Sequence, residues 1–211
     1  MARRLKDAFW NGFYIFVVVV SIALTKLIFR LRIKGRENVH RNEGYIIVAR
    51  HRSYWDVFLL AAALGVRNRI HFIARKGLMR NNAILQRIIE AYSTVIDRES
   101  FGREDFRQMR EAIREQRLIG IFPEGTTRRR AGAKVGAIHF ANLSDKKILP
   151  VNIFAAGPYP PKYPFGFPAI TISIGEGFSA GSLDGDIAND IPRATRNQIL
   201  SDRLMERVDR T

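Results

Sequence analysis

The chain contains no cysteine and is short of acidic residues. Of its 211 residues, 20 are Asp or Glu against 35 Lys or Arg, which gives a formal net charge of +15. The lack of cysteine excludes disulfides, thiolate nucleophiles and cysteine-based metal sites. The positive charge, carried mostly by arginines suited to bidentate phosphate contacts, indicates a polyanionic partner such as nucleic acid, anionic lipid or an acidic carrier molecule. The alternative is that these basic residues only contact water at the surface and bind no partner.

A long apolar run lies near the start of the chain. Residues 9–29 contain a single lysine, Lys26, and a transmembrane helix needs about 20 such residues. Basic residues flank both ends, so charge does not choose an orientation, and a segment lying in one leaflet is an alternative to a spanning one. No Ala-x-Ala site follows the run, which argues against a cleaved signal peptide. We expect residues 1–33 to anchor the protein, with a core helix as the structural alternative.

The rest of the chain, residues 34–211, alternates short apolar runs with segments of helical period. This alternation predicts one α/β domain with a mixed, largely parallel sheet flanked by helices. The expected strands are 45–49, 71–75, 93–97, 118–122, 148–154 and 169–175. The expected helices are 54–64, 82–91, 103–117, 134–143 and 192–208. The proline-rich loop 157–168 is expected to connect two strands rigidly, or else to contact an acyl tail or a membrane.

The most informative segment is Arg50-His51-Arg52-Ser53-Tyr54-Trp55-Asp56, just after an expected strand. Ligands of open α/β sheets bind at this end of a strand. Residues five apart do not share a helix face, so a turn must separate His51 from Asp56. Ser53 is expected to supply it as helix N-cap, and a purely structural capping pair is the alternative. In the functional interpretation, Asp56 accepts a hydrogen bond from one imidazole nitrogen while the other acts as general base.

The sequence has no Gly-x-Ser-x-Gly nucleophile elbow, so a serine nucleophile is unsupported. A His–Asp pair without a nucleophile requires an activated electrophile, such as a thioester. The acceptor hydroxyl then attacks that electrophile directly.

A second polar segment, Phe122-Pro123-Glu124-Gly125-Thr126, follows the strand expected at 118–122. Pro123 and Gly125 favour a tight turn with Glu124 at its apex, and three arginines follow at 128–130. Carboxylate, hydroxyl and guanidinium groups together can bind phosphates and hydroxyls; an acidic turn beside a solvated basic run is the alternative. Further basic residues, Lys76 and Arg98, follow two other strands, which favours one shared site.

These motifs, in this order, resemble those of the glycerolipid acyltransferase family, specifically bacterial 1-acylglycerol-3-phosphate acyltransferases. His51 and Asp56 match the family's His-x4-Asp block, and Phe122 to Thr126 match its Phe-Pro-Glu-Gly-Thr block. Ile96-Asp97-Arg98 and Ile148-Leu149-Pro150-Val151 match two further blocks. The matching blocks cover roughly residues 34–178.

The resemblance implies a glycerol-3-phosphate acyltransferase-like fold and transfer of a fatty acyl group from acyl-CoA or acyl-carrier protein to the sn-2 hydroxyl of lysophosphatidate. It implies that His51 deprotonates this hydroxyl, that Asp56 orients His51, and that no acyl-enzyme forms. No metal or other cofactor is expected. The expected location is the cytoplasmic face of the cell membrane, reached through residues 8–29, with membrane lipids and both substrates as partners. The expected substrate-binding residues are Lys76, Arg98, Glu124, Gly125, Thr126, Arg128 and Arg130.

Two positions depart from the family pattern. Arg50 stands where the family often has Asn, and it either acts electrostatically on the histidine or contacts the phosphate. Thr127 stands where the family often has Arg. A one-residue shift turns a side chain in an extended segment to the other face, so the choice of phosphate ligand among Arg128, Arg129 and Arg130 stays open.

Other functions are also open at the sequence level. Within the family, the acceptor can be another lysolipid or glycerol-3-phosphate. From other classes, the alternatives are a basic nucleic-acid-binding protein and a membrane scaffold with an inactive acyltransferase fold. No named nucleic-acid motif is present, so no nucleic-acid partner is expected, and the intact His51, Asp56 and Glu124 argue against the scaffold.

Overall fold

The structure of the protein is a computed structural model. It describes residues 2–78, 82–97, 100–125, 133–164, 166–188 and 190–211, without the side chains of residues 2–7 and 85.

Within the described residues, seven strands form one sheet in the order β1-β7-β6-β2-β5-β3-β4. All neighbouring strands are parallel except β6 and β7, which pair antiparallel. The mixed, largely parallel α/β fold predicted from the sequence is therefore confirmed. The strands are β1 Arg32–Lys34, β2 Tyr45–Val48, β3 Ile70–Arg75, β4 Ser93–Ile96, β5 Leu118–Ile121, β6 Lys147–Ala156 and β7 Ala169–Ile174.

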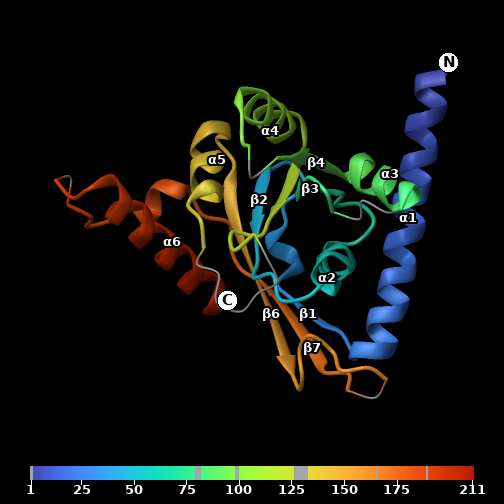
Figure 1. The fold of residues 1–211 in the computed structure, drawn as a ribbon. Helices are drawn as coiled ribbons and strands as arrows, with labels where there is room; N and C mark the ends of the chain where they lie inside the picture. Colours follow the sequence, from blue (N-terminus) through green and yellow to red (C-terminus); the bar gives the residue numbers. More distant parts are fainter. Residues whose placement is uncertain (1, 79–81, 98–99, 126–132, 165, 189) are drawn as a thin grey trace.

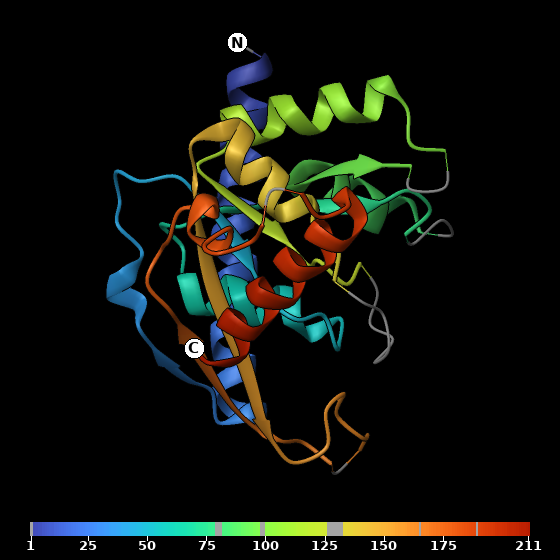
Figure 2. The same cartoon turned by 90° about the vertical axis from the view of Figure 1, so that its left-hand side faces the viewer.

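Helices cover both faces of the sheet, and α1 and α6 lie on opposite sides of the molecule (Figure 1). Figure 2 shows α6 crossing in front of the sheet when the molecule is turned. The α-helices are α1 Ala2–Phe29, α2 Trp55–Leu64, α3 Ala83–Tyr92, α4 Arg103–Glu115, α5 Gly136–Ser144 and α6 Arg193–Asp209, and the 3-10 helices are η1 Arg36–Asn38 and η2 Ala180–Leu183.

The central strand β2 is buried on both faces. Tyr45 and Ile47 pack into the core cluster on the side of α2, whereas Ile46 and Val48 pack into the cluster that includes α4, α5 and α6. This explains the uninterrupted apolar sequence of the strand, because a parallel strand covered on both faces needs apolar side chains at every position.

Strand β1 was not expected from the sequence. It has three residues, Arg32, Ile33 and Lys34, and both basic residues are exposed. It lies at one edge of the sheet and pairs in parallel with β7. A single apolar side chain shows no period, so the sequence gives no strand signal here.

Helix α1 packs along the domain through one stripe of buried residues, while its other side is exposed and apolar. The contacts of α1 are chiefly with α2. Over Ala8–Phe29 the helix is long and apolar enough to cross a membrane, judged by length and composition. The buried stripe consists of Tyr14, Val18, Ser21, Thr25 and Phe29. The large exposed apolar residues of α1, among the side chains that the structure describes, are Phe9, Ile15, Phe16, Val19, Val20, Leu24 and Leu27.

Gly120 in β5 allows a ring to lie across the middle of the sheet. A Cβ at this position would lie 2.6 Å from two ring carbons of Phe72. The Phe72 ring in turn stacks on that of Phe122, with 6.0 Å between the ring centroids. The missing side chain of Gly120 therefore makes room for a layer of aromatic rings.

We predict that Gly120→Ala lowers the free energy of unfolding by about 1–3 kcal/mol, because overpacking forces the Phe72 ring to move. Urea or thermal unfolding measures this change. Gly181→Ala is the matched control, since a Cβ there would meet no heavy atom within 4 Å. Equal stability of the two variants would contradict the packing argument.

Candidate active site

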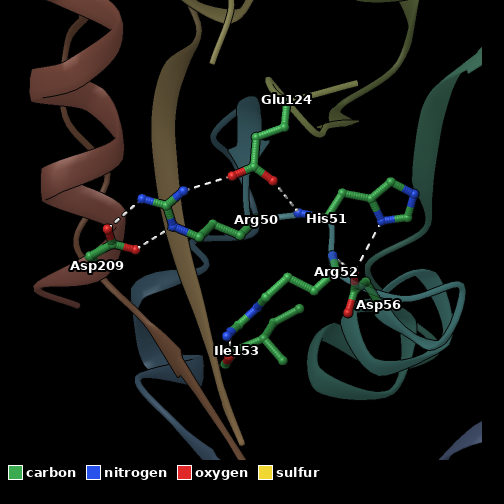
Figure 3. A network of polar contacts seen from close by, with 7 residues as sticks. All are labelled: Arg50, His51, Arg52, Asp56, Glu124, Ile153 and Asp209. Atoms are coloured by element: carbon green, nitrogen blue, oxygen red, sulfur yellow. Dashed lines mark hydrogen bonds and ion pairs between the residues drawn. The ribbon is translucent and has the colours of Figure 1, made fainter. Parts of the chain in front are cut away.

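Two polar turns meet at one edge of the sheet. One follows β2 and carries His51; the other follows β5 and carries Glu124 (Figure 3). Strands β2 and β5 are parallel neighbours, with Val48 paired to Ile121. Parallel strands end at the same edge of a sheet, so segments about seventy residues apart lie side by side.

His51 and Asp56 are in direct contact. The imidazole Nδ1 lies 3.0 Å from Asp56 Oδ2. If Asp56 is ionised, Nδ1 carries the proton and donates it to this bond, which leaves Nε2 as the acceptor nitrogen. One face of the imidazole stacks on the Phe122 ring, with 4.2 Å between centroids and 18° between planes. The ring is thus fixed in orientation, and its Nε2 can accept a proton.

The Asp56 carboxylate is buried, with 1% of its side chain exposed. Its Oδ2 accepts the backbone N–H groups of Arg52 at 2.6 Å and Ser53 at 2.8 Å, besides the bond to His51. Its Oδ1 accepts the hydroxyl of Tyr159. These donors compensate for the removal of a charge from water.

The prediction that Ser53 is the N-cap of the helix is wrong by one residue. Helix α2 begins at Trp55, and Tyr54 occupies the N-cap position without a side-chain cap bond. The Ser53 hydroxyl accepts the N–H of Trp55 at 3.3 Å, and the Ser53 carbonyl accepts the N–H of Asp56 at 3.1 Å. The backbone N–H of Ser53 donates to the Asp56 carboxylate, as the N-cap residue does in a capping box, so the structural capping contact is present as well. The expected turn between His51 and Asp56 is present.

Tyr159 completes this site and was not expected there. It lies in the loop after β6, and burial, followed by the nearby charge of Asp56, raises the pKa of its hydroxyl. The hydroxyl therefore stays protonated and donates to Asp56 at neutral pH. The guanidinium of Arg52 lies over the Tyr159 ring, 5.7 Å from its centroid, and donates to the carbonyl of Ile153. No local sequence pattern links Tyr159 to Asp56, 103 residues away.

Glu124 contacts the same turn from the other side. Its Oε2 accepts the backbone N–H of His51 at 3.1 Å, and its Oε1 accepts from Arg50 Nη1 at 2.6 Å (Figure 3). Arg50 also makes a bidentate ion pair with Asp209 at the end of α6, at 2.7 Å and 2.5 Å. Hydrogen bonding to Asp209, then to Glu124, raises the pKa of Arg50 against the opposing effect of burial. Asp209 was not among the expected site residues.

Of the remaining expected site residues, the structure describes Gly125 and Lys76. Gly125 has a φ of 64° and lines a cavity beside His51, and its N–H donates to the Phe122 carbonyl at 2.9 Å. Lys76 is exposed and pairs with Asp97, 3.4 Å from its carboxylate. The other expected residues, Thr126, Arg98, Arg128 and Arg130, together with the alternative ligand Arg129, lie outside the described residues.

Comparisons with known proteins show the family to which the chain belongs. Residues 30–154 match the family model described as "Acyltransferase". The chain belongs to the acyltransferase family. The family resemblance inferred from the ordered sequence motifs is confirmed.

Two relatives and one solved structure resemble this acyltransferase. A 1-acyl-sn-glycerol-3-phosphate acyltransferase of Bacillus subtilis is 26% identical over 179 residues, covering 84% of this chain and 86% of the relative. A protein of the same name from Streptococcus pneumoniae is 30% identical over 114 residues, covering 54% of this chain and 42% of the relative. The crystal structure of the lysophosphatidate acyltransferase PlsC of Thermotoga maritima covers 99% of this chain and 95% of its own, with a TM-score of 0.60 and 18% identity. This last likeness shows the shared fold.

A cavity of about 240 Å³ lies beside His51 in the acyltransferase. Apolar side chains, including Phe72, Leu78 and Ile89, form much of its wall, and Arg75 and Gly125 contribute polar groups. An apolar space next to an oriented imidazole suits a substrate that has an acyl chain and a reacting hydroxyl.

We predict that Tyr159→Phe lowers the free energy of unfolding by about 1–3 kcal/mol, because it leaves a buried oxygen of Asp56 without its donor. The same change loosens the orientation of His51, so kcat falls as well. Thermal unfolding and steady-state kinetics measure the two effects. Tyr163→Phe removes a hydroxyl from an exposed residue of the same loop and serves as control. If both variants behave alike, the bond to Asp56 has no special role.

Proposed function

We propose that this acyltransferase moves a fatty acyl group from an acyl thioester, acyl-CoA or acyl-carrier protein, to the sn-2 hydroxyl of lysophosphatidate. The product is phosphatidate, a precursor in phospholipid biosynthesis. The observation that carries the proposal is the His51–Asp56 pair at 3.0 Å beside a cavity lined by both apolar and polar side chains. The names of the relatives from Bacillus subtilis and Streptococcus pneumoniae support lysophosphatidate as the acceptor.

In the proposed mechanism, the imidazole Nε2 of His51 takes the proton of the acceptor hydroxyl as its oxygen attacks the thioester carbonyl. Asp56 holds the Nδ1–H and stabilises the imidazolium that forms, without itself becoming protonated. The tetrahedral intermediate then expels the thiolate, which takes the proton from His51 and leaves as the free thiol. One ester bond forms as the thioester bond breaks, and no acyl-enzyme is needed.

The acceptor's phosphate is proposed to bind basic residues that follow the strand ends. Arg75 lines the cavity beside His51, and Lys76 follows it at the end of β3. The other proposed ligands, Arg98, Arg128 and Arg130 together with the hydroxyl of Thr126, are carried by the resemblance and by the ability of guanidinium groups to grip phosphate. Gly125 lets the backbone approach the glycerol.

Membrane association through α1 is part of the proposal. Its exposed side is apolar along the helix, whereas the buried stripe from Tyr14 to Phe29 packs on the domain. A helix packed on a polar domain along one side cannot be surrounded by lipid, so this arrangement supports a helix lying in one leaflet. We propose that it holds the active site at the cytoplasmic face of the cell membrane, where lysophosphatidate is available.

We predict that His51→Ala lowers acyl transfer by about 10²- to 10⁴-fold, because it removes the general base. The assay uses one labelled acyl donor with lysophosphatidate, another lysophospholipid and glycerol-3-phosphate as acceptors. His139→Ala is the matched control, since His139 is exposed on α5. Retained transfer in His51→Ala would contradict the base assignment, and preference for another acceptor would contradict the proposed substrate.

We predict that replacing Phe9, Phe16 and Leu27 together by Gln weakens binding to anionic lipid vesicles by more than about tenfold. Each of these exposed side chains gains about 1.5–3 kcal/mol when it leaves water for an apolar phase. Vesicle sedimentation measures the change. The control replaces Phe106 and Leu143, exposed on α4 and α5, by Gln. Equal binding of the two variants would exclude α1 as the lipid contact.

A further inference from the structure

The residue before the catalytic-site histidine makes ion pairs with two carboxylates from distant parts of the chain. The Nη1 of Arg50 donates to Glu124, and its Nε and Nη2 donate to Asp209. The three bonds are 2.5–2.7 Å long. The planar guanidinium makes this possible, because it presents several N–H groups in a fixed fork.

The charges around Arg50 argue against one of its two expected roles, contact with the substrate phosphate. A guanidinium held by two carboxylates carries no surplus positive charge for a substrate phosphate, and the group of three has a net negative charge. A phosphate approaching Arg50 would also meet Asp209, whose side chain is 47% exposed. Arg50 therefore does not fit the role of phosphate ligand.

Asp209 is held in place by the fold. Its backbone carbonyl accepts from Asn152 Nδ2 on β6 at 3.0 Å. Leu204, Met205 and Val208, in the last two turns of α6, are buried in the core. The carboxylate of Asp209 is therefore presented from a rigid helix end rather than from a loose surface segment.

The contacts continue from Arg50 to the histidine backbone. Glu124 is the link: one oxygen accepts from Arg50 and the other accepts the N–H of His51. The side chain of Glu124 is 11% exposed, so water offers it little alternative hydrogen bonding. Asp209, Arg50 and Glu124 thus form a chain of contacts that ends on the backbone of His51.

We propose that Asp209 and Arg50 are positioning residues that hold Glu124 against the His51 backbone and so set the place of the general base. This inference rests on the proposed function, because its readout is acyl transfer. It gives a role in the reaction to α6, which lies outside residues 30–154, the range that matches the family model. Neither residue touches the substrate.

The test compares kcat and KM for lysophosphatidate and an acyl-CoA, measured with the purified full chain on vesicles. We expect Asp209→Asn to lower kcat by about tenfold to a hundredfold, the range that small misplacements of catalytic groups produce, while KM changes by less than about twofold. Asp209→Glu keeps the carboxylate and should recover part of the loss. A role in stability alone would lower the melting temperature and the active fraction without any recovery specific to Glu.

A second pair of variants tests the contact chain without depending on the folding of Asp209→Asn. Arg50→Lys keeps the charge but cannot bridge both carboxylates with a fixed fork, so we expect a loss in kcat of similar size. Because Arg50 and Asp209 act through one contact, the double variant Arg50→Gln with Asp209→Asn should be no slower than Arg50→Gln alone.

The matched control is Glu206→Gln, which breaks the exposed 2.5 Å pair between Glu206 and Arg210 near the same end of α6. It should keep the wild-type kcat. Wild-type kcat in Asp209→Asn, with His51→Ala inactive, would overturn the inference and leave the proposed function intact. A wild-type protein that transfers no acyl group to any lysolipid would overturn both.

Discussion

The arrangement of the site depends on the burial of the Asp56 carboxylate. A buried charge must find its hydrogen-bond donors within the fold, and Asp56 finds them in the His51 ring, two backbone N–H groups and the Tyr159 hydroxyl. The backbone N–H groups of Arg52 and Ser53 point toward this carboxylate just before α2, which begins at Trp55. One side chain thereby fixes the turn, the orientation of the imidazole and the loop after β6.

The topology of the sheet supplies these partners. Strand β2 lies between β5 and β6, and it is parallel to both. The carboxyl ends of the three strands therefore point to the same edge. The chain that leaves β2 carries His51, the chain that leaves β5 carries Glu124, and the chain that leaves β6 carries Tyr159. An active site built this way needs no exact spacing in sequence, only the parallel order of three neighbouring strands.

The sequence predicts the parts of this arrangement that repeat or that form ordered motifs. The alternation of apolar runs and helical periods was enough to predict the sheet and its helices, and the ordered blocks were enough to predict that His51 lies beside Asp56. The same alternation did not predict β1, because its single apolar residue shows no period. The sequence patterns also gave no sign of Tyr159 or Asp209 as site residues. Tyr159 contacts Asp56, 103 positions before it in the chain, and Asp209 contacts Arg50, 159 positions before it. Such pairs arise from tertiary packing, and a local pattern holds no information about them.

The contacts of His51 form two groups: one acts on the orientation of the imidazole ring, and the other acts on the position of the backbone. Asp56 and the Phe122 ring act on the imidazole and determine which way it faces. Glu124, which accepts from Arg50, also accepts the backbone N–H of His51 and, in our proposal, sets where this residue lies. The two groups meet at His51 and in the turn from Phe122 to Gly125, which carries both the ring and Glu124. Tyr159 supports the first and Asp209 the second, and both lie beyond the matched family range that ends at residue 154. The strand ends thus bring His51 and Asp56 together, while the loop after β6 and the end of α6 contribute contacts to Asp56 and to Arg50.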